Sequence, residues 1–251
     1  MLFFDIDATL LDHERAEELG AIEFLKASNE QLNLSASEFV KLWHGLSDKY
    51  FEKFLLKELS FQEQRRMRIK ELFGHQLSNE QVDQKFEDYL KFYKANWAAF
   101  EDVIPCLEQL KKQGNRLGVI SNGDYHQQIE KLESINVKKY FDIIITSSVM
   151  GVSKPNPTIF IEASSQAGVP IHESYYIGDR LETDAIASQK AGMKGIWLNR
   201  KNKTSHSGVM VIHSLSELRA INQVTSFFSI KLQMNLPRNE VNYRKGHVQC
   251  S

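Results

Sequence analysis

Apolar and polar positions change their spacing along the chain, and this change separates two kinds of structure. Residues 1–7 are an apolar run that ends in acidic residues, which is typical of a short buried strand. Residues 14–98 instead carry apolar positions at helical spacing. This stretch predicts four helices, at about 14–28, 36–57, 61–73 and 79–98. The sequence favours Ser37 as the cap of the second, and Ser78 or Asn79 as the cap of the fourth.

From about residue 103 onward, short apolar runs alternate with segments of helical pattern. The runs predict strands at 116–121, 141–146, 174–177, 195–198 and 210–213. The segments between them predict helices at 105–114, 125–135, 157–167 and 182–191, with a short one from residue 215. Strands that alternate with helices are typical of an α/β fold with a parallel sheet covered on both faces. Ligands of such sheets bind where the strands end and loops lead into helices.

The two patterns predict two units and a tail. Residues 1–13 and 99–222 are expected to form the α/β core domain, and residues 14–98 a helical domain inserted after the first strand. Residues 233–251 are polar and lack periodicity, which predicts a disordered tail.

Composition places the chain among ordinary globular proteins and narrows its partners. Of its 251 residues, 42% are hydrophobic and 25% are charged. Lys and Arg total 31 and Asp and Glu 32, so the near-neutral charge argues against a nucleic acid polymer as partner. No apolar run reaches the roughly 18 residues of a membrane span, so no membrane is expected. The acidic start lacks a secretory signal, and Cys106 and Cys250 cannot build a disulfide framework, so a cytoplasmic location is expected.

The first candidate motif is Asp5-Ile6-Asp7, at the exit of the first predicted strand. Two carboxylates at a spacing of two lie on the same side of an extended chain. They repel each other unless a cation neutralises them, and Mg²⁺ prefers such oxygen ligands. The plainer alternative is a pair of acids at a strand exit, one of which caps a helix.

Two further groups suit the binding of an anion. Ser121-Asn122-Gly123 lies at a strand-to-helix turn, where a hydroxyl and main-chain N–H groups can meet a phosphate. Lys154 lies beyond another strand, in a segment that Pro155 and Pro157 stiffen. An ordinary capped turn and a solvated loop lysine are the alternatives.

A last acidic group follows the strand at 174–177. That strand leads through Gly178 to Asp179, and Asp184 comes within the first turn of the next predicted helix. Acids near a helix N-terminus are favourable in any case, which is the alternative explanation.

The order of these groups is more informative than any one of them. Asp-x-Asp, then Ser, then Lys, then Gly-Asp, each after a predicted strand, resembles the haloacid dehalogenase (HAD) superfamily. The resemblance covers about residues 1–220 and puts the helical insert in the position of that family's C1 cap. It implies a Rossmann-like core. Three stretches are similar to its branch of small-molecule phosphatases, nucleotidases and dehalogenases: Ser121-Asn122-Gly123 with Gln128 and Lys131-Leu132, Gly151-Val152-Ser153-Lys154-Pro155, and Ala191-Gly192-Met193.

The resemblance also implies roles for the motif residues. Asp5 matches the nucleophile that forms an aspartyl-phosphate, and Asp7 matches the general acid/base. Asp5, Asp179 and the main-chain carbonyl of Asp7 match the Mg²⁺ ligands. The residues that match the phosphate clamp are Ser121, the Asn122 amide and Lys154. Asp184 matches an acid that supports the metal or Lys154 from behind the direct ligands.

One position departs from the family pattern. The family usually has Gly where this chain has Ala8. Gly tolerates left-handed backbone angles that cost Ala energy. Ala8 is therefore expected in a helical or bridge-like turn.

The expected activity is that of a Mg²⁺-dependent phosphatase. Its substrate is expected to be a small soluble phosphate monoester, either a nucleoside monophosphate or a sugar phosphate, and the protein a monomer or weak homodimer. A phosphomutase of the same superfamily and a non-catalytic binding or regulatory protein of this fold are the alternatives. Asp7 argues against a dehalogenase, because dehalogenases of this family typically lack the second acid.

The helical insert is less informative. It holds a basic cluster of Arg65, Arg66, Arg68 and Lys70, which is able to meet an anionic substrate, although a solvated helix face is the commoner explanation. His13 lies near the junction of the two units and can approach the site.

Overall fold

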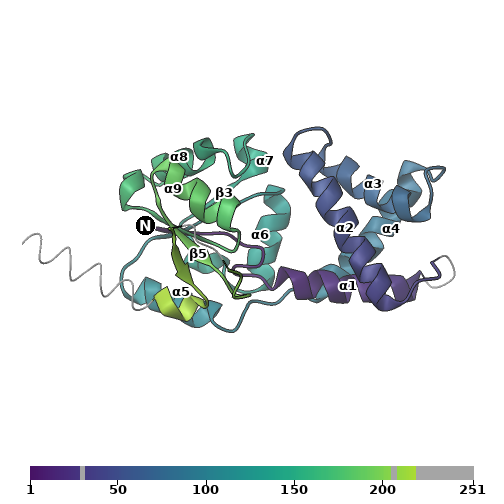
Figure 1. Cartoon of the computed structure of the whole chain (residues 1–251), viewed down its shortest axis with the longest axis horizontal. Helices are drawn as coiled ribbons and strands as arrows, with labels where there is room; N and C mark the ends of the chain where they lie inside the picture. The colour runs from purple at the N-terminus through teal and green to yellow at the C-terminus, as the bar shows by residue number, and fades with distance from the viewer. Residues whose placement is uncertain (29–31, 205–207, 219–251) are drawn as a thin grey trace, which may run out of the picture.

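A parallel six-stranded sheet forms the centre of the larger part of the molecule (Figure 1). The computed structural model describes residues 1–28, 32–204 and 208–218. Within them the strand order is β3-β2-β1-β4-β5-β6. The strands are β1 (Leu2–Phe4), β2 (Leu117–Ser121), β3 (Ile143–Thr146), β4 (Tyr175–Gly178), β5 (Lys194–Leu198) and β6 (Met210–Ile212).

Helices cover both faces of this sheet. Alternate residues of β1 separate the two faces: Leu2 and Phe4 belong to one hydrophobic core, and Phe3 to the other. The first core includes residues of α5 (Val103–Lys112) and α6 (Tyr125–Ser134), and the second includes residues of α8 (Pro157–Gln166) and α9 (Ala187–Ala191). The prediction of an α/β, Rossmann-like core is confirmed.

Shorter elements complete the connections between the strands. They are α7 (Ser147–Met150), the 3₁₀ helices η1 (Lys138–Tyr140), η2 (Ile171–Glu173) and η4 (Leu215–Glu217), and the π-helix η3 (Leu181–Ile186). The helix expected at 182–191 is thus split into η3 and α9. Residues 219–222 and the predicted tail at 233–251 lie outside the described residues. No helix in the described part of the chain has the length and hydrophobicity needed to cross a bilayer.

Four helices follow β1 and form a separate group beside the sheet (Figure 1). They are α1 (His13–Ala27), α2 (Ala36–Leu55), α3 (Phe61–Phe73) and α4 (Asn79–Ala95), called the helical unit below. An aromatic cluster holds the unit together. Trp43 of α2 is fully buried, and its ring centroid lies 4.3 Å from that of Tyr89 on α4 and 5.8 Å from that of Phe24 on α1.

Serine caps fix where three of these helices begin. Ser35 accepts a hydrogen bond from the N–H of Glu38, and the Glu38 carboxylate accepts one from the N–H of Ser35. The prediction of Ser37 as this cap is wrong, because the glutamate that completes the reciprocal pair stands three residues after Ser35. Ser78 caps α4, one of the two residues predicted there.

The two connections between the sheet and the helical unit run side by side. Leu11 and Ala99 form an antiparallel bridge. The N–H of Asp12 donates to the carbonyl of Ala98 at 2.9 Å, and the N–H of Phe100 donates to that of Leu10 at 3.2 Å. The chain therefore enters and leaves the helical unit at one place.

Arg200, two residues after β5, ties this junction to the core. The Arg200 guanidinium donates to both carboxylate oxygens of Asp102, at 2.8 and 2.9 Å, and to the carbonyl of Thr9 at 3.0 Å. Ser214 donates a further hydrogen bond to Asp102. The loop that follows β1 is thus held in place by residues distant in sequence.

Candidate active site

The ends of three neighbouring strands bring the predicted site residues together. Asp5 follows β1, Ser121 ends β2 and Asp179 follows β4, and β1 lies between the other two strands. A cavity of about 470 Å³ opens there, between the sheet and the helical unit. All the predicted site residues line it: Asp5, Asp7, Ser121, Asn122, Lys154, Asp179 and Asp184.

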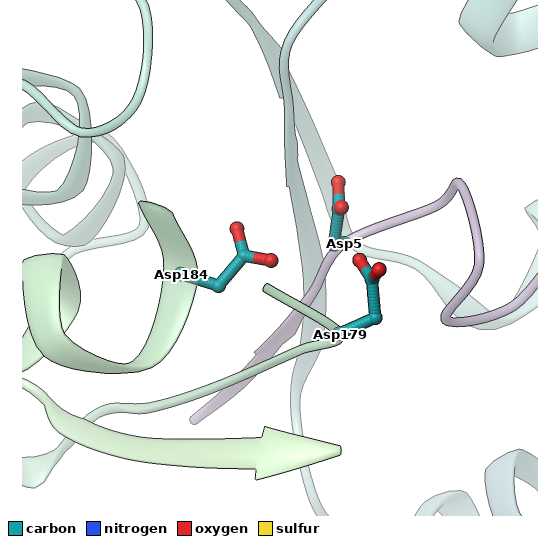
Figure 2. A group of neighbouring side chains, drawn as sticks. All are labelled: Asp5, Asp179 and Asp184. Carbon is teal, nitrogen blue, oxygen red and sulfur yellow. The ribbon is translucent and has the colours of Figure 1, made fainter. Parts of the chain in front are cut away.

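Three carboxylates face one another in this cavity (Figure 2). Oxygen atoms of Asp5, Asp179 and Asp184 all lie within 4.8 Å of one another. Burial, together with the charges of Asp184 and Asp5, raises the pKa of Asp179 to about 8. No hydrogen-bond or ion-pair partner for the Asp179 carboxylate is found among the described residues. Hard oxygen ligands, excess negative charge and an unpartnered carboxylate together fit a divalent cation such as Mg²⁺.

Lys154 supplies positive charge from within the protein. Its ammonium is almost fully buried and lies 2.9 Å from Asp5, 2.8 Å from Asp184 and 2.7 Å from the Tyr176 hydroxyl. Burial opposes the charge, but the two carboxylates raise the pKa of Lys154 above its ordinary value. The Tyr176 hydroxyl in turn donates to the carbonyl of Ile120. Lys154 is therefore a fixed ammonium beside Asp5.

Asp184 holds that lysine in place. Its side chain is fully buried, with one oxygen accepting from Lys154 and the other from the N–H of Arg180 at 2.9 Å. A Cβ at Gly178 would lie 2.5 Å from this carboxylate, so only glycine leaves room for it. This packing explains why Gly precedes Asp179 in the motif.

Asp5 is buried at the bottom of the cavity. Burial and the negative charges of Asp184 and Asp7 raise its pKa in spite of the ion pair with Lys154. Its main-chain N–H donates to the carbonyl of Ile177 on β4 at 2.9 Å. The main chain at Asp5 is thus anchored to β4, and its carboxylate faces the acids described above.

Asp7 has a different environment from Asp5. The Lys131 ammonium lies 2.7 and 2.8 Å from its two oxygens, Gln128 reaches it at 3.5 Å, and His13 at 3.7 Å. Burial opposes its charge, but Lys131 and His13 lower the pKa of Asp7 to about 2. The carboxylate is therefore ionised at neutral pH. His13 also forms a 2.7 Å hydrogen bond with the Tyr93 hydroxyl, which connects Asp7 to α4.

In the sequence, Lys131 and Gln128 were part of the resemblance to one branch of the family, and no contact with Asp7 was predicted for them. Their spacing of three on α6 places both on one face of that helix, which was the available signal. Polar residues at that spacing are common on solvated helices, so the sequence alone does not single them out.

The strand-to-helix turn at β2 offers polar groups to the same cavity. The Ser121 hydroxyl is buried and makes only a long contact, 3.4 Å, with the carbonyl of Asn122. The Asn122 side chain donates to the carbonyl of Lys154 and accepts from its N–H, at 3.0 and 2.8 Å. Any contact of Asn122 with an anion therefore falls to its main-chain N–H.

The expectation for Ala8 is wrong. Its φ is 57°, in the left-handed region, rather than in a helical or bridge-like turn. The reason is the tight loop after β1, in which the N–H of Ala8 donates to the carbonyl of Leu11 at 2.9 Å. This loop turns the chain from Asp7 toward the junction.

The order and geometry of these residues agree with a known family. The family model of haloacid dehalogenase-like hydrolases matches residues 2–198. The chain belongs to this family. It is therefore an enzyme of the hydrolase class, as the sequence motifs predicted.

Curated relatives of this hydrolase include named phosphatases. It is 31% identical over 209 residues to glyceraldehyde 3-phosphate phosphatase of Methanopyrus kandleri, covering 79% of this chain and 83% of the relative. It is 27% identical over 235 residues to human N-acylneuraminate-9-phosphatase, covering 88% of this chain and 93% of the relative.

Solved structures share the fold of this hydrolase. The magnesium-bound structure of the HAD-hydrolase YfnB from Bacillus subtilis superposes with a TM-score of 0.75, at 22% identity, over 88% of this chain and 97% of that one. A 2-haloacid dehalogenase from Pseudomonas syringae superposes with a TM-score of 0.67, at 25% identity, over 89% and 98%. Because this dehalogenase and the phosphatases named above share one family, the fold alone does not choose the reaction.

Proposed function

We propose that this hydrolase is a Mg²⁺-dependent phosphatase of small soluble phosphate monoesters. The observation that carries the proposal is the meeting of Asp5, Asp7 and Lys154 in one cavity, where two carboxylates that follow β1 face the ammonium of a lysine from the loop after α7. A phosphoryl group needs a nucleophile, a proton carrier and positive charge, and these residues offer all three.

In the proposed reaction, a carboxylate oxygen of Asp5 attacks phosphorus and the bond from phosphorus to the ester oxygen breaks. The departing oxygen takes up a proton and leaves as an alcohol. Water then attacks the aspartyl-phosphate, gives up a proton, and releases inorganic phosphate with the Asp5 carboxylate restored. In this proposal Lys154 and Ser121, which both line the cavity, hold the phosphoryl oxygens during both steps. Asp184 keeps Lys154 in position.

Asp5, Asp179 and the main-chain carbonyl of Asp7 would hold Mg²⁺ in this proposal. The cation, when bound, neutralises negative charge on the phosphoryl oxygens and on the carboxylates. The close approach of Asp5 and Asp179, and the unpartnered carboxylate of Asp179, support this assignment.

The ionised state of Asp7 bears on its proposed role. A carboxylate with a pKa of about 2 is ionised, as a base must be, but the ion pair with Lys131 makes it a weak base for the attacking water of the second step. To give a proton to the leaving alcohol in the first step, Asp7 must first separate from Lys131. This separation raises the pKa of Asp7. Both proposed roles of Asp7 therefore require its ion pair with Lys131 to loosen during the reaction.

The named relatives support the substrate class. They include phosphatases of glyceraldehyde 3-phosphate and of N-acylneuraminate 9-phosphate. A pyrimidine 5'-nucleotidase of Escherichia coli is 33% identical over 114 residues, which cover 45% of this chain and 51% of the relative. All three names describe small phosphate esters. A sugar phosphate or a nucleoside monophosphate is the substrate class that we propose.

The test is the release of inorganic phosphate from p-nitrophenyl phosphate and from a panel of sugar phosphates and nucleotides, with and without Mg²⁺. We expect Asp5→Asn to lower kcat at least about a thousandfold, because the amide is a poor nucleophile. Asp88→Asn, on the solvent side of α4 and outside the cavity, is the matched control and should keep wild-type rates.

Two results would contradict the proposal. Metal-independent turnover, or turnover that survives in Asp5→Asn, would exclude the proposed chemistry. Isomerisation of a sugar phosphate without phosphate release would identify a phosphomutase instead.

A further inference from the structure

The arginines of α3 have different surroundings, although they are close in sequence. Arg66 points away from the cavity and forms a two-point ion pair with Asp83 of α4, at 2.8 and 2.6 Å. Arg65 and Arg68 are three residues apart on another face of the helix, and both line the cavity that contains Asp5. The basic cluster seen in the sequence is thus divided between a solvated ion pair and the cavity wall.

Arg68 is a buried charge without a counterion. Its side chain is about 7% exposed, and its terminal nitrogen donates to Gln64 at 2.7 Å. Its Nε atom is fully buried and has no hydrogen-bond partner. No carboxylate of the described residues lies within 4.0 Å of it. A guanidinium cannot lose its charge to relieve this situation, so its burial is costly unless an anion arrives.

The two carboxylates whose charges act on Arg68 do not form an ion pair with it. Glu17 of α1 and Asp48 of α2 act on Arg68 only from a distance. Glu17 instead lies within 4.0 Å of two imidazoles, at 3.7 Å from His13 and 3.6 Å from His44. Glu17 therefore faces those two imidazoles and not Arg68.

Arg65 extends the positive surface of the same wall. Its guanidinium lies over the ring of Phe61, 4.3 Å from the centroid, and 5.2 Å from the centroid of Phe86. It too forms no ion pair with a described residue. Stacking leaves the edge of the guanidinium free to donate hydrogen bonds. The cavity therefore has aromatic residues and two arginines without an ion-pair partner among the described residues on its helical side, whereas Lys154 belongs to the sheet part.

We propose that Arg68, assisted by Arg65, binds a second anionic group of the substrate. The inference rests on the proposed function: Lys154 and the acids hold the phosphoryl group to be transferred, and Arg68 takes a carboxylate or a second phosphate on the side of the cavity that the helical unit forms. A guanidinium donates two parallel hydrogen bonds to either group. Preferred substrates are accordingly small phosphate monoesters that carry one more negative group, and the cavity of about 470 Å³ accommodates a molecule of sugar size.

The first experiment compares matched substrates on the wild-type enzyme with Mg²⁺. Glucose 6-phosphate and 6-phosphogluconate have the same phosphate, and the latter adds a carboxylate. Fructose 6-phosphate and fructose 1,6-bisphosphate differ by a second phosphate. We expect kcat/KM to be at least about tenfold higher for the more anionic member of one pair. The pair that shows the preference identifies the group as carboxylate or phosphate. Equal values in both pairs overturn the inference.

Variants then assign the preference to Arg68. Arg68→Gln should reduce the ratio within the preferred pair by at least about tenfold, and Arg68→Lys should retain part of it. Arg66→Gln removes the same charge from the same helix outside the cavity, and should keep the wild-type ratio. Should Arg68→Gln fail to fold, Arg68→Lys and the wild-type ratios still decide. An unchanged ratio in a folded Arg68→Gln excludes the assignment.

A binding measurement separates failure of this inference from failure of the proposed function. Calorimetric titration of Asp5→Asn with Mg²⁺ and the same four compounds requires no turnover. Tighter binding of the more anionic compound, without phosphate release by the wild type, supports the second-anion site and contradicts the phosphatase activity. Phosphate release by the wild type, with equal binding of the two compounds in each pair, supports the phosphatase activity and contradicts the second-anion site. If neither phosphate release nor a binding preference is observed, both proposals are contradicted.

Discussion

Ala8 shows how one residue of the site departs from the conformation that its type prefers. In the left-handed region the Cβ of an alanine crowds the following carbonyl, at a cost of roughly 1–2 kcal/mol. The loop from Ile6 to Leu11 requires this conformation to turn the chain after Asp7. The structure therefore carries local strain directly beside Asp7, one of the residues assigned to the reaction.

Ala8→Gly is expected to relieve this strain. Glycine adopts the left-handed region freely, although it also gains freedom in the unfolded chain. We expect a net rise of about 1 kcal/mol in the free energy of unfolding. Urea denaturation followed by circular dichroism measures this difference. A less stable Ala8→Gly protein would show that the alanine methyl makes contacts that outweigh the strain.

Single residues also show what the sequence can and cannot reveal about the site. Asp5, Ser121, Lys154 and Asp179 were found because each follows a predicted strand, and parallel strands end at one edge of a sheet. Lys131 was not predicted to contact Asp7, because it lies on a helix, where a buried lysine and a solvated one look alike in sequence. Contacts between side chains distant in sequence require the fold.

At the scale of elements, local signals located most helices and strands to within a few residues. Serine caps, glycines and apolar periodicity act over a few residues, so they are visible in the sequence. The π-helix η3 was missed. Its wide turn includes a bond from the N–H of Ala185 to the carbonyl of Arg180, and its Asp184 is held by Lys154. A turn that depends on such a distant contact has no local signature.

The packing of α1 on α4 depends on one glycine. A Cβ at Gly20 would lie 2.8 Å from the Cα of Tyr93, which is main chain and cannot move aside alone. Tyr93 also holds His13, which contacts Asp7. The distance between these two helices is thus linked to the geometry beside Asp7.

Gly20→Ala is expected to push the two helices apart and to lower the free energy of unfolding by about 1–3 kcal/mol. Gly45→Ala is the matched control, since Gly45 is exposed in α2 and an added Cβ would meet nothing within 4 Å. That change should instead stabilise the protein by up to about 1 kcal/mol, through better helix propensity. Thermal and urea unfolding of both variants measure the contrast. Equal effects would show that the α1–α4 contact tolerates expansion.

Over the whole molecule, Asp102 connects segments that are far apart in sequence. Burial opposes its charge, but hydrogen bonds from Arg200, Ser214 and the N–H of Leu215 lower its pKa below the ordinary value. Through Arg200 it also reaches the loop after β1. An acid whose pKa is lower in the folded state stabilises the fold above its unfolded pKa, and this contribution disappears as pH falls through the folded pKa.

Asp102→Asn is expected to lower the free energy of unfolding by about 2 kcal/mol at pH 7, where the charge-assisted hydrogen bonds are present. The difference from the wild type should shrink from about pH 4 downward, because Asp102 then takes up a proton in the wild type as well. Urea unfolding across this pH range measures the difference. A gap that stays constant with pH would show that the charge of Asp102 adds nothing to stability.

The paired connections at Asp12 and Ala98 have a consequence for how such an enzyme can change. Their main chains are already within hydrogen-bond distance, so a short turn could replace everything between them without moving β1 or β2. The helical unit is, in this sense, a separable insertion between β1 and β2. Under the proposals above, Asp5, Asp7 and Lys154 belong to the sheet part, and Arg68 belongs to the helical unit. Exchange of the helical unit between relatives would then alter which substrates are accepted, while the residues proposed to break the ester bond stay unchanged.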